Sequence, residues 1–133
     1  MPTAAFGIAA REIMAAKRSS APEVRYRLRV TVGDAIAIGP GKVDLLEAID
    51  AVGSLTAAAR SLGMSYRRAW LLVDTMNKCF GAPVVRTAAG GARGGGTLLT
   101  EVGRDVVERY RRAEEAAYAA GRRDVDGILK LLR

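Results

Sequence analysis

Residues 53–80 constrain the fold most, because they show the pattern of two helices joined by a glycine turn. Ser54 is placed to cap a short helix that ends near Leu62, since its hydroxyl can accept from free N–H groups of the first turn. Gly63 can adopt the left-handed backbone that a sharp turn requires, and Ser65 can cap a longer second helix. The stretch therefore predicts a helix-turn-helix, a motif whose second helix can enter the major groove of DNA.

The second predicted helix has an apolar face and a basic face when its residues are placed about 100° apart. The apolar face comprises Ala69, Leu72, Val73, Met76 and Phe80, and the opposite face comprises Arg67, Arg68, Leu71, Asp74 and Lys78. The start of the basic face, with Ser65 and Tyr66, lies where recognition helices contact bases and phosphates. An ordinary amphipathic helix with a solvated charged face explains the same pattern, so neighbouring segments must decide.

Composition favours one small, helix-rich domain with a polyanionic partner. The chain has 133 residues, of which 50% are hydrophobic and 5% aromatic, and its net charge is +7. This charge favours nucleic acid ahead of an anionic membrane. The lone Cys79 cannot form an intramolecular disulfide, and no signal peptide or membrane span is evident, so the cytoplasm is expected.

Upstream of the helix pair we expect four segments. Residues 1–24 form an N-terminal extension, partly disordered or with a short amphipathic helix. Alternation from Arg25 predicts a half-buried strand whose inner face is Tyr26, Leu28, Val30 and Val32, followed by a turn and brief pairing over residues 35–38. Residues 42–52 predict a helix with Val43, Leu46, Ile49 and Val52 buried and with Asp44, Glu47 and Asp50 outside. This helix is locally acidic, so positive charge is concentrated on residues 53–80.

Downstream, the sequence predicts a β-hairpin with a glycine-rich tip. Residues 84–86 and 97–99 are expected to form its strands, around a loop over residues 87–96 that carries Arg93. A small-residue loop after a recognition helix suits a wing that contacts the DNA backbone or minor groove. A mobile surface loop is the alternative, whereas a phosphate-binding P-loop lacks the required Lys-Ser or Lys-Thr and the helix that should follow.

A long helix over residues 101–120, capped by Thr100, completes the expected domain. Its stripe of Val102, Val106, Tyr110, Ala113 and Ala117 can pair with a second copy across a two-fold axis. The same stripe can instead pack on residues 43–52 of its own chain, and both arrangements can coexist. Residues 121–133 are expected to form a basic C-terminal tail with a final apolar patch.

These residues resemble a known family. The order of strand, helix, SLTAAARSLGMSYRRAWLLVDTMN, glycine run and LLTEVGRDVVERY is similar to the N-terminal winged-helix domain of ModE-type molybdate-responsive transcriptional regulators, which is itself similar to the LysR-type DNA-binding domain. The resemblance covers about residues 25–120. Its most specific pieces are Gly63–Tyr66 followed by Ala69-Trp70, Asp74 and Met76-Asn77, then the glycine run and Leu99–Glu101 with Gly103.

The resemblance implies positions that approach DNA. It places Ser65, Tyr66, Arg67 and Trp70 on the recognition helix, Ser54 and Thr56 where the preceding helix meets phosphate, and Arg93 in the wing. Trp70 also lies at the border of the apolar face, where packing against Tyr66 or the wing is the alternative. Full regulators of this family continue into molybdate-binding domains, so molybdate binding is not expected of these 133 residues.

The sequence therefore predicts an α+β winged helix-turn-helix over residues 25–100 with a dimerisation helix over residues 101–120. We expect a homodimeric transcription factor that binds double-stranded DNA, with Arg67 and Arg68 as guanine or phosphate contacts. A winged-helix module for protein–protein interaction, or an architectural module without operator specificity, is the alternative. The absence of histidine and of paired carboxylates argues against an enzyme, a metal site or a cofactor.

Overall fold

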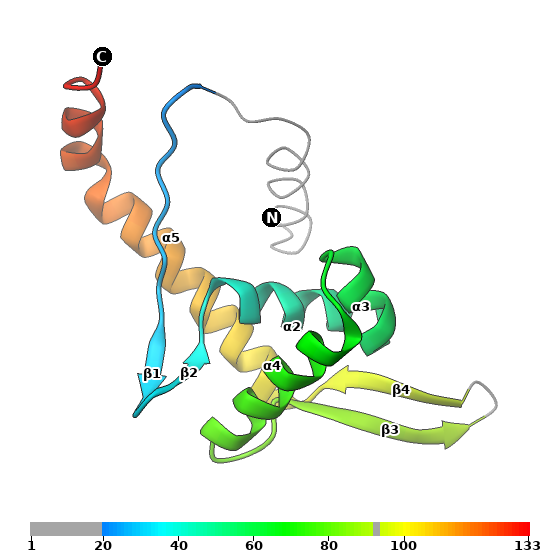
Figure 1. The fold of residues 1–133 in the computed structure, drawn as a ribbon. Helices are drawn as coiled ribbons and strands as arrows, with labels where there is room; N and C mark the ends of the chain where they lie inside the picture. Colours follow the sequence, from blue (N-terminus) through cyan, green and yellow to red (C-terminus); the bar gives the residue numbers. More distant parts are fainter. Residues whose placement is uncertain (1–19, 92–93) are drawn as a thin grey trace.

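The computed structural model describes residues 20–91 and 94–133, and their elements form an α+β domain with a long C-terminal helix (Figure 1). The elements are β1 (Val30–Val32), β2 (Ala35–Ile38), α2 (Pro40–Val52), α3 (Leu55–Ser61), α4 (Tyr66–Cys79), β3 (Val85–Gly91), β4 (Gly94–Leu99) and α5 (Glu101–Leu129). The predicted α+β class and the long C-terminal helix are confirmed. Arg93 and most of the predicted N-terminal extension lie outside the described residues.

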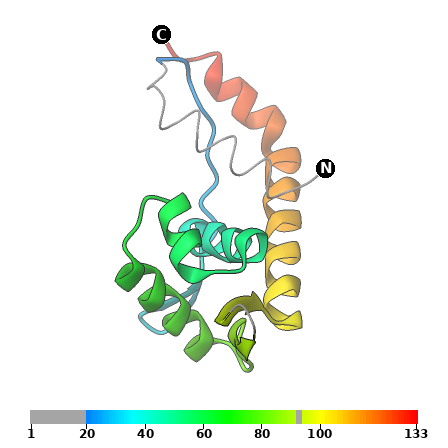
Figure 2. The ribbon, with the colours of Figure 1, turned by 90° about the vertical axis from the view of Figure 1, so that its right-hand side faces the viewer.

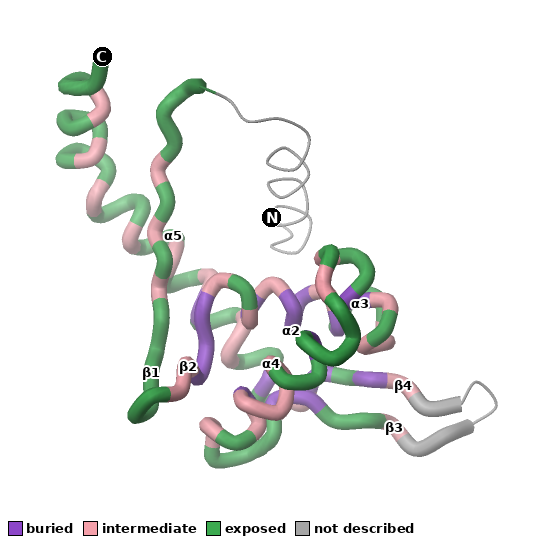
Figure 3. Tube along the Cα trace, viewed as in Figure 1, coloured by how far each residue is buried: buried purple, intermediate pink, exposed green. Residues whose placement is uncertain are grey.

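Helix α2 lies at the centre of the domain, and α3, α4, α5 and β4 all pack against it (Figures 2 and 3). Its side chains Val43, Leu46 and Ile49 are fully buried, as the helical spacing predicts. Leu45 is also fully buried, because neighbours cover α2 on more than one side. The prediction for Val52 was wrong: this side chain is 47% exposed, since the last turn of α2 leaves the core.

Two antiparallel hairpins flank the helices. In the first, Val32 pairs with Ala35 across a turn in which Gly33 has a φ of +58°. In the second, β3 and β4 pair from Val85↔Leu99 outwards, so most of the predicted loop over residues 87–96 belongs to the strands. The strands of the glycine-rich hairpin are therefore longer than the sequence predicts.

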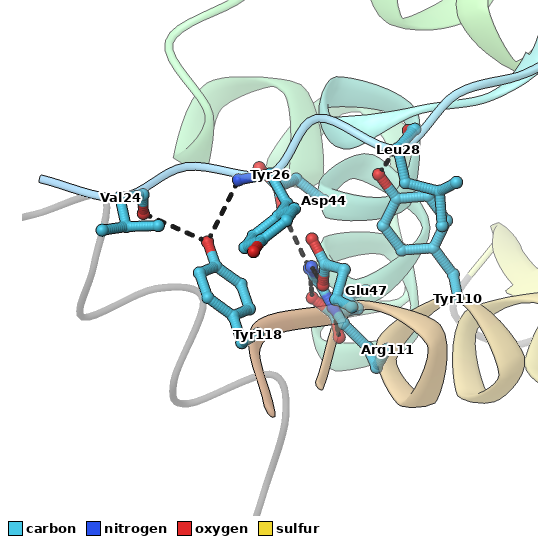
Figure 4. A network of polar contacts seen from close by, with 9 residues as sticks. Val24, Tyr26, Leu28, Asp44, Glu47, Tyr110, Arg111 and Tyr118 are labelled. Atoms are coloured by element: carbon cyan, nitrogen blue, oxygen red, sulfur yellow. Dashed lines mark hydrogen bonds and ion pairs between the residues drawn. The ribbon is translucent and has the colours of Figure 1, made fainter. Parts of the chain in front are cut away.

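The segment before β1 is held by a helix instead of a neighbouring strand (Figure 4). The hydroxyl of Tyr110 donates to the carbonyl of Leu28 (2.8 Å), and the hydroxyl of Tyr118 donates to the carbonyl of Val24 (3.3 Å). The predicted alternation is present, since Tyr26 and Leu28 are half-buried between exposed arginines. The strand itself is limited to Val30–Val32, because hydroxyl groups of α5 take the place of a strand ladder.

The predicted burial of Val30 and Val32 was wrong, because their side chains are 48% and 56% exposed. Both residues lie on β1, whereas its partner strand β2 buries Ala37 and Ile38 and contacts α4. Because β1 pairs with β2 alone among the described residues and lies outside the core, alternation overestimates burial there.

Helix α5 begins where expected, with the Thr100 hydroxyl accepting from the Gly103 N–H (3.0 Å), but it continues to Leu129. The glycine at position 121 does not end it. A Cβ at Gly121 would collide with the Tyr26 hydroxyl, so this glycine lets the segment before β1 lie against α5. Among the described residues, no helix has the length and apolar character needed to cross a bilayer.

Candidate nucleic-acid interface

Helices α3 and α4 are joined by a short turn with the caps that the sequence predicts. The Ser54 hydroxyl accepts from the Ala57 N–H (3.1 Å), and the Ser65 hydroxyl accepts from the Arg68 N–H (3.1 Å). Between the helices, Gly63 has a φ of +68°, a conformation that favours glycine. Local capping therefore fixes where α4 begins and which side chains its first turns present.

The first two turns of α4 expose a cluster of large side chains. Tyr66 and Trp70 are 54% and 49% exposed, and Arg67 and Arg68 are exposed beside them. The opposite face supplies Ala69 and Met76 to the core, while Leu72, Val73 and Phe80 pack against it. The predicted division of this helix is confirmed, and the Trp70 ring remains accessible to a partner.

The amide of Asn77 ties the end of α4 to the start of β3. Its Oδ1 accepts from the N–H groups of Val84 (2.8 Å) and Val85 (3.2 Å), and its Nδ2 donates to the Val85 carbonyl (3.1 Å). On β4, the N–H of Thr97 donates to the Gly53 carbonyl at the end of α2 (3.0 Å). The β3–β4 hairpin is therefore fixed beside α4. Sequence reasoning did not find this role, because no short-range pattern marks an asparagine whose partners lie past a turn.

A second polar network joins α5 to α2 around Arg111 (Figure 4). The guanidinium donates to Glu47 (2.5 and 3.0 Å), Asp44 (2.9 Å) and Glu114 (2.7 Å), and its side chain is 15% exposed. Burial lowers the pKa of Arg111, but hydrogen bonds to Glu47 and Glu114 outweigh burial and leave the pKa raised. The prediction that Glu47 faces solvent was wrong, because this ion pair lets its carboxylate be buried.

The predicted dimerisation stripe divides in the structure. Tyr110 is 4% exposed and Val106 packs against the core, so these two side chains serve the intrachain packing that the sequence left open. Burial is the main cause that raises the pKa of Tyr110 to about 12, which keeps its hydroxyl a donor to Leu28. Val102 and Ala113 remain exposed, and Ala117 is half-buried.

The predicted DNA-contact residues lie on two helix starts. Ser54 and Thr56 are at the beginning of α3, and the other predicted contacts in the described residues are at the beginning of α4: Ser65, Tyr66, Arg67, Arg68 and Trp70. Within residues 20–91 and 94–133, no group of three or more His, Cys, Asp or Glu side chains could hold a metal ion.

The candidate site is thus a capped basic helix beside an anchored antiparallel hairpin, in a compact α+β domain. No family model matches the chain. It is 43% identical over 90 residues to the molybdenum transport protein ModE of Azotobacter vinelandii, covering 68% of this chain and 33% of that protein. It is 46% identical over 77 residues to the molybdenum-pterin-binding protein MopB of Rhodobacter capsulatus, covering 58% of this chain and 28% of that protein.

A third relative is the DNA-binding transcriptional dual regulator ModE of Escherichia coli (strain K12), which is 35% identical over 71 residues. This match covers 53% of the present chain and 27% of the relative. The resemblance to ModE-type regulators is therefore confirmed. The chain spans about a third or less of the length of these curated relatives.

Proposed function

We propose that the chain is a sequence-specific transcriptional regulator that binds double-stranded DNA as a homodimer in the cytoplasm. In this proposal the domain acts as a winged helix: α4 enters the major groove, and the β3–β4 hairpin is the wing that contacts the backbone or minor groove. The observation that carries the proposal is the exposed start of α4, where Tyr66, Arg67, Arg68 and Trp70 surround a capped first turn. The E. coli relative is named as DNA-binding, which supports the same function.

The chemistry at this end of α4 suits a duplex. Neither Arg67 nor Arg68 has an ion pair with a carboxylate of the described residues, so both guanidinium groups can donate to guanine or phosphate. The hydroxyls of Ser54 and Ser65 use their lone pairs for capping and keep their own O–H for a phosphate oxygen. Tyr66 and Trp70 offer apolar surface with a polar edge.

Selection of binding sites from a random duplex library tests sequence specificity directly. The wild-type chain should enrich a preferred site, and Arg67→Ala and Arg68→Ala should each weaken binding to it by about 1–3 kcal/mol without unfolding the protein. The matched control is Arg122→Ala with Arg123→Ala, which removes the same charge from an exposed part of α5 far from α4. Full affinity of the Arg67/Arg68 double variant for the selected site would contradict the role of these two residues as DNA contacts.

The same experiment separates the second candidate, an interaction or architectural module. Such a protein would enrich no preferred site, and a protein-binding surface would show little of the steep salt dependence that phosphate contacts produce. The two exposed guanidinium groups on α4, unpaired among the described residues, favour the DNA-binding function, because each can donate two parallel hydrogen bonds to guanine or phosphate acceptors of a duplex.

A further inference from the structure

Helix α4 has a neighbour on each side of its exposed face. Asn77 bonds to β3 on one side. Arg68 lies nine positions earlier in the same helix, which at about 100° per residue places it on the opposite side. Helix α4 packs against β2 and against α2, and Figure 1 shows it between the β1–β2 and β3–β4 hairpins.

Two further cations lie on the Arg68 side. Lys42 is in the first turn of α2, and the stem of Arg29 packs at Gly39, where its Cγ would lie 3.4 Å from an added Cβ. Burial lowers the pKa of the Lys42 ammonium, and Arg68 and Arg29 lower it further, against an opposing effect of Cys79. Arg68 and Arg29 are thus both charged neighbours of Lys42. We refer to Arg29, Lys42 and Arg68 as the flanking cluster.

The flanking cluster is unfavourable in the free protein. Within the described residues, none of its members has an ion pair with a carboxylate. The ammonium of Lys42 also lies at the positive end of the α2 dipole, where the first turn holds no acidic residue. A bound polyanion would relieve the repulsion of Lys42 by Arg29 and Arg68 and the unfavourable position of its ammonium at the start of α2.

We propose that Arg29 and Lys42, together with Arg68, bind the phosphodiester backbone on the side of α4 opposite to the hairpin. The inference rests on the proposed function, in which α4 enters the major groove. A groove about 12 Å wide is bounded by two backbones, so a helix inside it has phosphates on both sides. The hairpin faces one backbone and the flanking cluster faces the other, which holds α4 in register between them.

The test is the salt dependence of duplex binding for Lys42→Gln, Arg29→Gln and the double variant, measured by fluorescence anisotropy. The probes are a duplex carrying the library-selected site and a scrambled duplex of the same length and composition. Each lost phosphate contact should reduce the slope of log affinity against log salt by about 0.9. Both probes should weaken equally, because phosphate contacts carry no sequence information. Arg122→Gln and Arg123→Gln are the matched controls and should leave the slope unchanged.

Thermal unfolding of the same variants separates binding from folding. Lys42→Gln should keep or raise the melting temperature, because it removes like-charge repulsion and an unfavourable dipole interaction. Arg29→Gln changes an exposed side chain and provides a second folded variant. Unchanged slopes in both variants would overturn the inference and leave the proposed function intact. Weakening confined to the selected site would also overturn it, and failure of the wild-type chain to bind either duplex would remove the proposed function itself.

Discussion

Arg111 is the residue that fixes α5 on α2. One guanidinium bonds to carboxylates from both helices and lies 5.8 Å from the centroid of the Tyr110 ring. Because Arg111 and Glu47 are both largely buried, each depends on the other for compensation of its charge. The pair therefore joins α5 to α2 through mutually compensated charges.

Arg111→Met should lower the free energy of unfolding by about 3 kcal/mol, because it leaves the buried Glu47 carboxylate without its partner. Chemical denaturation monitored by circular dichroism measures this change. The control is Arg109→Met, which removes an exposed ion pair to Asp105 from the same helix and should cost less than about 0.5 kcal/mol. Equal effects of the two substitutions would contradict the role given to Arg111.

At the scale of elements, the hairpin and α5 meet at Gly103. A Cβ at this position would collide with the backbone of Val84, and the Thr100 N–H donates to the carbonyl of the same residue (3.0 Å). The Thr100 hydroxyl also donates to the Pro83 carbonyl (2.7 Å). The start of α5 therefore contacts residues 83–84, and Asn77 of α4 bonds to Val84 and Val85. Helix α4, the hairpin and α5 thus meet at one junction.

Gly103→Ala should destabilise the domain by about 1–3 kcal/mol, because backbone atoms have to move to admit the methyl group. The same substitution at Gly127, also in α5, meets no atom within 4 Å and should stabilise the helix by up to about 1 kcal/mol. In thermal denaturation, the melting temperature should fall for Gly103→Ala and rise for Gly127→Ala. A stabilised Gly103→Ala would disprove that close approach.

Local signals predicted where the capped helices begin. Serine or threonine caps mark the beginnings of α3, α4 and α5, because a cap acts within three residues of its own position. The end of α5 was predicted too early, because Gly121 was taken as a helix stop. Its missing side chain instead leaves room for the Tyr26 hydroxyl, and Tyr26 is far away in the sequence. The limited β1 strand has the same cause, because tyrosines of α5 bond to the segment before it.

At the scale of the whole molecule, the candidate site was predictable where it depends on one helix and hidden where it depends on several. Periodicity found the exposed start of α4, and the resemblance gave its residues a role. The flanking cluster combines residues before β1, in α2 and in α4, and helix α2 was read only as an acidic support. The burial of Glu47 was likewise hidden, because its partner Arg111 lies 64 positions away in the chain.

The length of α5 bears on assembly, because its C-terminal half projects beyond the core beside the segment before β1 (Figures 1 and 2). If this helix pairs with its counterpart in the proposed homodimer, Ala113→Glu should shift the chain from dimer to monomer in sedimentation velocity, since Ala113 is an exposed member of the predicted stripe. Ala119→Glu makes the same exchange at an exposed position about 120° around the helix and should leave the dimer intact. A wild-type chain that sediments as a monomer, or a dimer that only Ala119→Glu dissociates, would rule out this stripe as the interface.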